Sequence, residues 1–88
     1  MGGKAVDSVR TREYDTLLTV LKAARKSAHL TQRDLSLKLG KSFSYIAKIE
    51  KGTRRIDVVD FIEIAAALGI DPNELFKTVT EQIATGSA

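Results

Sequence analysis

The chain contains no cysteine and no tryptophan, and it has only one proline and one histidine. Without cysteine, neither a disulfide framework nor a thiolate metal site can form. No apolar run approaches the roughly 18 residues of a membrane-spanning helix. The opening residues, MGGKAVDS, also lack the apolar core of a signal peptide. These absences predict a cytoplasmic protein without a membrane partner.

Residues for catalysis and cofactor binding are equally scarce. His29, the lone histidine, has no neighbours that would complete a metal site or a catalytic pair. Ser42 and Ser44 have no histidine or lysine arranged to activate their hydroxyls as nucleophiles. We therefore expect no enzyme activity, no metal, no cofactor and no small-molecule effector.

The 88 residues suffice for one domain. No segment shows the alternation of apolar and polar residues that is typical of a strand, so the sequence predicts an all-α fold. We expect a single domain over residues 11–84, with a flexible arm at 1–10 and a flexible end at 85–88.

Helical patterns account for most of this domain. Apolar residues at positions 14, 17, 18, 21, 24 and 28 form one stripe, which predicts a first helix with Thr11 as a possible N-cap. Asp57 is expected to cap a fourth helix, whose inward residues would be Phe61, Ile62, Ala65, Ala66 and Leu68. Asp71 and Pro72 give a capping residue and a first-turn proline for a fifth helix.

Between these helices, residues 31–52 read TQRDLSLKLGKSFSYIAKIEKG and predict a helix-turn-helix. Thr31 can cap the first helix of the pair, and Gly40 can adopt the left-handed conformation that ends it. Ser36 is small, as a close crossing of two helices requires. Ser42 can cap the second helix, which we place at residues 42–51.

Charge is distributed unevenly along the chain. Bases outnumber acids ten to two between residues 22 and 55, which gives that segment a net charge of +8. From residue 56 to the end, one base faces six acids, a net charge of −5. A basic segment that coincides with a helix-turn-helix indicates a protein that binds a polyanion.

The stretch LKAARKSAHLTQRDLSLKLGKSFSYIAKIEKGTRR, followed by LGIDPNELF, resembles the lambda-repressor-like, or Xre, family of helix-turn-helix regulators. The resemblance covers roughly residues 18–76. It implies a compact five-helix bundle that binds double-stranded DNA sequence-specifically as a transcription regulator. Repression is the expected mode, exerted by a homodimer on a pseudo-palindromic operator.

Four kinds of residue match the pattern of this family. Gln32 matches the glutamine that opens the second helix and usually holds a phosphate. The positions that would face base edges from the recognition helix are Ser42, Phe43, Ser44 and Lys48. The loop after that helix usually meets the DNA backbone and matches Lys51, Thr53, Arg54 and Arg55. Arg25 and Glu50 match a structural ion pair between the first and third helices.

Several of these assignments have alternatives. Phe43 stands where many relatives have glutamine, and its ring could press on a thymine methyl group or turn into the core. Tyr45 could contact a phosphate or cover the core. Arg54 and Arg55 are expected on phosphates, although one of them could only tether the loop. Lys41, which borders the recognition helix, is also expected to contact a phosphate.

The fifth helix is the candidate dimer interface, through the stripe formed by Leu75, Phe76, Val79 and Ile83. The same stripe could instead close the core of the monomer. A protein-interaction module on the same fold is the rival function. Among DNA-binding proteins, restriction–modification controllers and antitoxins of toxin–antitoxin pairs share this length and motif.

Overall fold

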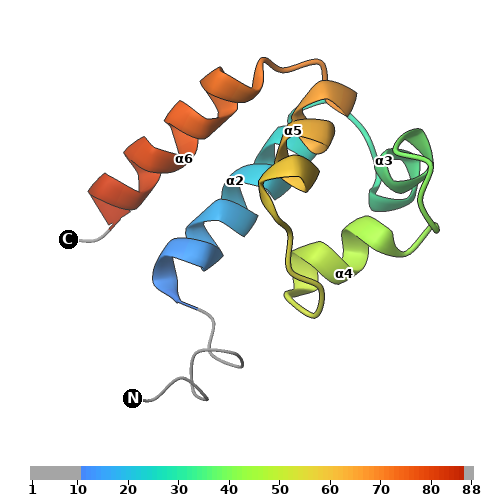
Figure 1. Cartoon of the computed structure of the whole chain (residues 1–88), viewed down its shortest axis with the longest axis horizontal. Helices are drawn as coiled ribbons and strands as arrows, with labels where there is room; N and C mark the ends of the chain where they lie inside the picture. The colour runs from blue at the N-terminus through green and yellow to red at the C-terminus, as the bar shows by residue number, and fades with distance from the viewer. Residues whose placement is uncertain (1–10, 87–88) are drawn as a thin grey trace.

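The computed structural model describes residues 11–86, and this part of the chain forms five helices and no strand (Figure 1). The helices are α2 (Arg12–Ser27), α3 (Gln32–Lys38), α4 (Tyr45–Lys51), α5 (Val58–Ala67) and α6 (Pro72–Gly86). The all-α prediction is confirmed. The predicted arm, 1–10, and residues 87–88 lie outside the described residues. Residues 85 and 86, which the sequence predicts to be part of a flexible end, continue α6.

Side-chain caps determine where most of these helices begin. Thr11 accepts a hydrogen bond from the backbone N–H of Tyr14 at 3.0 Å. Thr31 and Asp34 form a reciprocal capping box at the start of α3, and Asp57 and Asp60 form another at α5. The backbone N–H and hydroxyl of Thr31 lower the pKa of the Asp34 carboxyl. The predicted caps of these three helices are therefore confirmed.

The start of α4 differs from the prediction. The helix begins at Tyr45 rather than at residue 42, and its N-cap is Ser44, which makes no side-chain capping bond. Ser42 belongs to a turn, in which its carbonyl accepts from the Tyr45 N–H at 3.1 Å. The Ser42 hydroxyl lies 3.5 Å from the Ser44 hydroxyl and therefore does not cap the backbone of α4.

Ser36 joins α3 to α4 at their crossing. Its side chain is completely buried, and its hydroxyl donates to the Gln32 carbonyl at 2.8 Å. The same oxygen accepts the backbone N–H of Ile46 at 2.9 Å, which satisfies one of the first donors of α4. Gly40 has φ of 72° in the turn between the helices, where a left-handed residue is required. A single small polar residue thus fixes the geometry of the helix pair.

α2 packs against both α4 and α6, while α5 packs against α6 (Figure 1). One core fills the space between the helices, and its residues are Leu18, Val20, Leu21, Leu35, Tyr45, Ile46, Ile49, Phe61, Ile64, Ala65, Leu75 and Val79. The inward face of α5 was only partly predicted. Ile64 is buried, whereas Ile62 is 46% exposed and Ala66 is also exposed. Phe61, Ile64 and Ala65 follow the spacing of one helical face, and Ile62 lies outside that face.

A buried ion pair connects α2 to α4. The Arg25 Nε donates to Glu50 Oε2 at 2.7 Å, and its Nη2 donates to Glu50 Oε1 at 3.1 Å. The remaining Nη1 donates to the Leu30 carbonyl at 2.8 Å, in the turn that leads to α3. The Gln32 amide also donates to Glu50 Oε1 at 2.8 Å. The predicted pair is confirmed, and it is the centre of a network that reaches three helices.

Replacing Ser36 with alanine should lower the free energy of unfolding by about 1–3 kcal/mol, because the buried Ile46 N–H would lose its acceptor. Urea unfolding monitored by circular dichroism measures this change. Ser27→Ala, at an exposed serine on α2, is the matched control and should change stability little. Equal stability of the two variants would contradict the role assigned to Ser36.

Replacing Glu50 with alanine should destabilise the domain by about 3–5 kcal/mol, because it leaves the Arg25 charge buried without its partner. The melting temperature and the urea midpoint should both fall sharply. Glu81→Ala removes an exposed carboxylate from α6 and serves as the control. An unchanged melting temperature in Glu50→Ala would show that the pair does not stabilise the fold.

Candidate nucleic-acid interface

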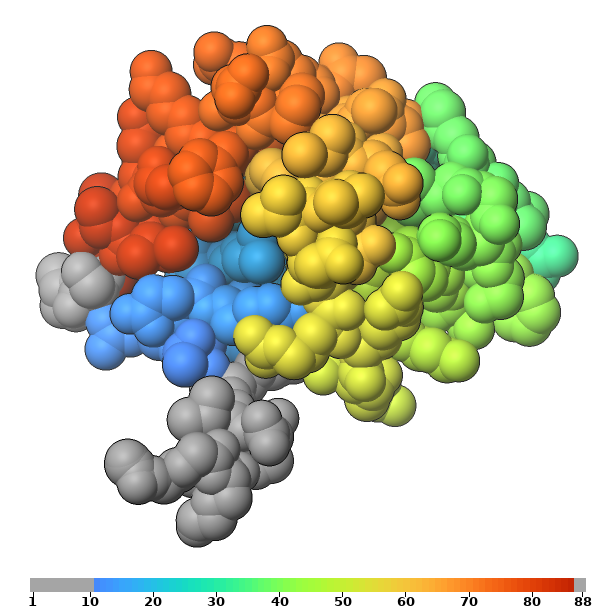
Figure 2. Space-filling view, viewed as in Figure 1, coloured from blue at the N-terminus to red at the C-terminus, as the bar shows by residue number. Residues whose placement is uncertain are grey.

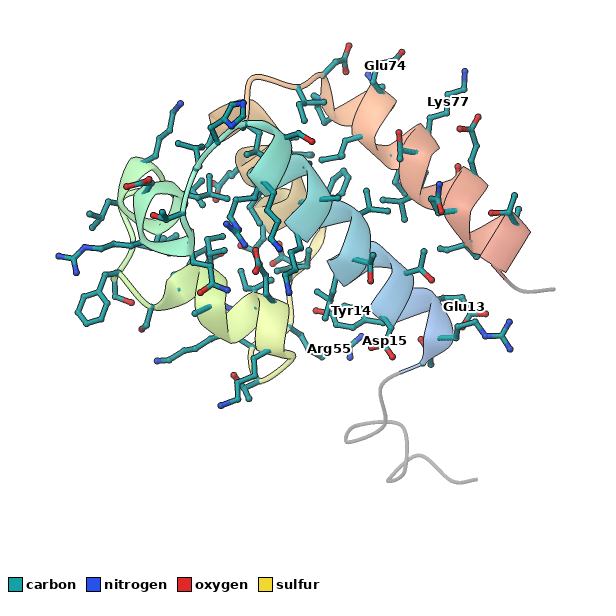
Figure 3. The ribbon with its side chains drawn as sticks, turned by 180° about the vertical axis from the view of Figure 1, so that it is seen from behind. Glu13, Tyr14, Asp15, Arg55, Glu74 and Lys77 are labelled. Carbon is teal, nitrogen blue, oxygen red and sulfur yellow. The ribbon has the colours of Figure 1, made fainter. Side chains whose placement is uncertain are left out.

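The structure separates the charges of the chain into two regions. Once Arg25 and Glu50 are paired, the segment from residue 22 to 55 keeps nine bases and one acid, so its net charge stays at +8. Nitrogen-tipped side chains extend outward from α3, α4 and the loop after α4 (Figure 3). The acids of the second half belong to α5, to α6 and to the capping positions that precede them. Most bases of the segment therefore lie on the helix-turn-helix and the loop after it, while Lys22 and Lys26 lie on α2.

α4 has one buried face and one exposed face. Tyr45, Ile46 and Ile49 are buried, whereas Lys48 and Lys51 are exposed. Ser42 and Phe43 are exposed in the turn before the helix, and Ser44 is half-buried at its N-cap. The structure thus gathers the four predicted base-contacting residues, which are Ser42, Phe43, Ser44 and Lys48, at the first turns of α4 and at their approach. Phe43 is 62% exposed, which excludes the inward alternative for its ring.

The loop after α4 is folded back onto the helix end. Gly52 has φ of 92° and ends the helix in the left-handed conformation. The Lys48 carbonyl accepts from the backbone N–H groups of Thr53 and Arg54, at 3.0 and 3.2 Å, and from the Thr53 hydroxyl at 3.2 Å. These bonds hold Thr53 and Arg54 beside the exposed face of α4, and both side chains remain exposed.

Tyr45 lies in the core and not on the surface. Its side chain is only 6% exposed, and burial raises the pKa of its hydroxyl, with a further contribution from the charge of Asp60. The Arg54 guanidinium lies 4.9 Å from the centre of its ring, and the Lys41 ammonium lies 5.4 Å from the same point. This geometry favours the predicted alternative in which Tyr45 covers the core. The ring also holds two exposed cations at the edge of α4.

Arg55 is positioned by α2. Its guanidinium lies 4.0 Å from the ring centre of Tyr14, and the Tyr14 hydroxyl accepts the backbone N–H of Ile56 at 3.2 Å. Figure 3 shows the two side chains next to each other, between the start of α2 and the loop. Arg55 therefore packs against α2, while its side chain stays exposed.

Gln32 is half-buried at the start of α3. Its amide nitrogen donates one hydrogen to Glu50. A glutamine amide carries two such hydrogens, so a second donor is left for another acceptor. The ion-pair network thus fixes the orientation of the side chain that was predicted to hold a phosphate.

One feature of this surface was not predicted. The Arg33 guanidinium, on α3, lies 5.3 Å from the centre of the Phe43 ring. These residues are ten positions apart, and only the crossing of α3 and α4 brings them together. No sequence pattern would have indicated this contact.

The dimer-interface prediction is partly wrong. Leu75 and Val79 are buried in the core of the subunit, and Ile83 is half-buried against that core. Only Phe76 is well exposed, at 58%, because it lies beside the inward stripe of α6. The stripe mainly closes the core of the monomer, which was the stated alternative.

Within residues 11–86, no helix is long and apolar enough to cross a membrane. The same part of the chain has no group of three or more histidine, cysteine or acidic residues that could hold a metal ion.

Related proteins share this arrangement. A family model described as helix-turn-helix matches residues 21–75. An uncharacterised HTH-type transcriptional regulator, y4dL, from Sinorhizobium fredii is 31% identical over 72 residues, which cover 77% of this chain and 37% of that protein. The chain therefore spans little more than a third of this relative's length.

Two solved structures have the same fold. An XRE-family like protein from Pseudomonas syringae pv. tomato superposes with a TM-score of 0.76 and 32% identity, over 90% of this chain and 96% of the other. The wild-type restriction–modification controller protein C.Esp1396I gives a TM-score of 0.77 over 85% of this chain and 99% of its own, and at 23% identity this likeness shows the fold alone. The helix-turn-helix family model covers more than half of the residues of this chain. The chain therefore belongs to the Xre-type helix-turn-helix family.

Proposed function

We propose that the protein is a sequence-specific double-stranded DNA-binding transcription regulator, which acts in the cytoplasm as a homodimeric repressor. The observation that supports this function best is the exposed cationic surface of the helix-turn-helix. The inner face of α4 is buried, its outer face is exposed, and exposed cations border that outer face at Lys41, Lys48, Lys51 and Arg54. A major groove about 12 Å wide accepts an α-helix presented in this way.

The roles follow from position. Ser42, Phe43, Ser44 and Lys48 would face base edges, since they occupy the exposed side of α4 and its approach. The phosphate contacts would come from Gln32, Lys41, Lys51, Thr53, Arg54 and Arg55. Tyr45 would act indirectly, because its buried ring holds Lys41 and Arg54 in place.

A homodimer is supported by an apolar surface on the other half of the domain. We call it the α5–α6 patch, and its residues are Val58, Val59, Ile62 and Phe76, which are 72, 59, 46 and 58% exposed. Val58 and Phe76 line one groove of about 410 Å³, and Phe76 packs edge-on against Phe61 with ring centres 6.3 Å apart. Figure 2 shows α5 and α6 meeting along one continuous face. Several exposed apolar side chains in one place are typical of a protein interface.

A second copy of the chain is the partner that suits this patch best. Two-fold dimers bury the same surface on both subunits, and an apolar patch is complementary to itself. The operator of a two-fold dimer has two half-sites about 34 Å apart, which the paired α4 helices would occupy. The patch replaces the α6 stripe as the proposed interface, and it keeps Phe76 from the original set.

Binding to duplex DNA should weaken steeply with salt, by roughly 0.9 log units of affinity per log unit of salt for each phosphate neutralised. The measurement is fluorescence anisotropy with operator duplexes selected from a random pool, at several salt concentrations. Lys41→Ala should reduce the slope of log affinity against log salt by about the contribution of one phosphate contact. It should weaken binding to all sequences alike. Lys77→Ala, on α6 and distant from α4 in Figure 3, should leave the slope unchanged. Affinity that is independent of salt would overturn the DNA-binding proposal.

Replacing Ile62 with glutamate should convert the dimer into a monomer, because each subunit would bring a negative charge into the apolar interface. Sedimentation equilibrium at micromolar concentration measures the association state, and circular dichroism confirms that the variant is folded. Leu37→Glu changes an apolar side chain of similar exposure on α3, and it should remain dimeric. A dimer that survives Ile62→Glu, or a monomeric wild type, would contradict the proposed interface.

A further inference from the structure

Arg33 and Phe43 form an exposed pair at the point where α3 meets the approach to α4. Both side chains are exposed, and the guanidinium carbon lies 5.3 Å from the centre of the ring. Arg33 is on the first turn of α3, one residue after Gln32. The pair therefore links Phe43, a predicted base-contacting residue, to the first turn of α3, where Gln32 is a predicted phosphate contact.

Arg33 keeps its hydrogen-bond donors available. Arg25 uses its donors in the buried network, Arg12 donates to the Gly86 carbonyl, and Arg54 donates to the Arg55 carbonyl. Arg33 makes neither a hydrogen bond nor a salt bridge with the residues that the structure describes. A guanidinium has five N–H donors, and the Phe43 ring has no nitrogen or oxygen acceptor that would use any of them.

We infer that Arg33 and Phe43 act together as a base reader, in which Phe43 packs on the methyl group of a thymine and Arg33 binds the O6 and N7 of a neighbouring guanine. The inference rests on the proposed DNA-binding function and adds a specificity residue to it. Phe43 has no donor or acceptor, so its ring can recognise only the apolar methyl group of the major groove. A bidentate arginine is the commonest specific partner of guanine.

The contact between the two side chains explains how Arg33, a residue of α3, can be positioned to contact a base. A long arginine normally samples many rotamers, and ordering it opposes binding. Packing on the Phe43 ring restricts those rotamers before DNA arrives. Phe43 thus positions Arg33 as well as contacting a base.

The test uses the full chain and operator duplexes selected from a random pool. For wild type, changing the guanine of one half-site should weaken binding by about 5- to 150-fold, the usual range for loss of a bidentate pair. In Arg33→Ala the same base change should leave the affinity nearly unchanged, a ratio close to onefold. Lys38→Ala removes an exposed charge from the same helix and should keep the full penalty.

Arg33→Lys distinguishes base reading from phosphate contact. Lysine keeps the charge but lacks the planar fork, so guanine discrimination should fall below that of wild type while the salt dependence stays as in wild type. If Arg33 only met a phosphate, Arg33→Ala would weaken every sequence equally and Arg33→Lys would restore binding. That result would overturn the inference and leave the proposed function intact.

Deoxyuridine in place of the thymine tests Phe43 by removing one methyl group. Wild type should bind this duplex about fourfold more weakly, as expected for one buried methyl group. Phe43→Ala should bind both duplexes alike. Equal binding of both duplexes by wild type would contradict the role of Phe43. If wild type selects no duplex at all, the proposed function fails, and this inference fails with it.

Discussion

The buried contact between Arg25 and Glu50 is the constraint on which the rest of the structure depends. Arg25 donates to Glu50 of α4 and to the Leu30 carbonyl before α3, and Gln32 of α3 donates to the same carboxylate. Three helices are thereby fixed relative to one another by directional bonds, which apolar packing alone would not provide. Burying two charges is costly, and removing one partner would leave the other charge buried and unpaired. The geometry matters here because α4 is only seven residues long and would not be a stable helix by itself.

The different surfaces of the two halves of the domain, one formed by α3 and α4 and the other by α5 and α6, follow from that arrangement. α4 turns its apolar side chains toward the core, so its lysines lie outside, and the loop after it is folded back by the Lys48 carbonyl. α5 and α6 carry the acids, and they also leave Val58, Ile62 and Phe76 exposed. These exposed apolar side chains thus lie on α5 and α6, outside the basic helix-turn-helix. The modest net charge of +3 conceals this polarity, because it averages two opposite surfaces.

Local chemistry made most of the fold predictable, and contacts between distant residues account for most of what was missed. Thr11, Thr31 and Asp57 cap their helices as their types indicate, since capping depends on neighbouring residues only. The predicted start of α4 was wrong because Ser42 does not cap this helix. The Ser42 hydroxyl lies next to that of Ser44, and the hydroxyl of Ser36, on the preceding helix, accepts the Ile46 N–H. Ile62 was assigned to the core because several faces of an alanine-rich, apolar helix look alike until its packing partner is known. The residues of the candidate surface were named through the family resemblance, but the contact between Arg33 and Phe43 was not predicted, because it exists only after α3 and α4 cross.

The phenylalanine at position 43 shows why the two helices of the motif must be considered together. An amide at this position could read adenine through two hydrogen bonds, and an apolar ring cannot. If α4 alone supplied the base contacts, a phenylalanine at this position would give lower sequence specificity than a glutamine. An apolar ring packed on a methyl group distinguishes one base from another only weakly. An arginine on α3 can restore this specificity only if its position is fixed, because ordering a mobile side chain on binding loses conformational entropy. The crossing that Ser36 and the Arg25–Glu50 network enforce supplies that fixed position. The interactions that hold the helix pair together therefore also determine which side chains can act as one recognition unit.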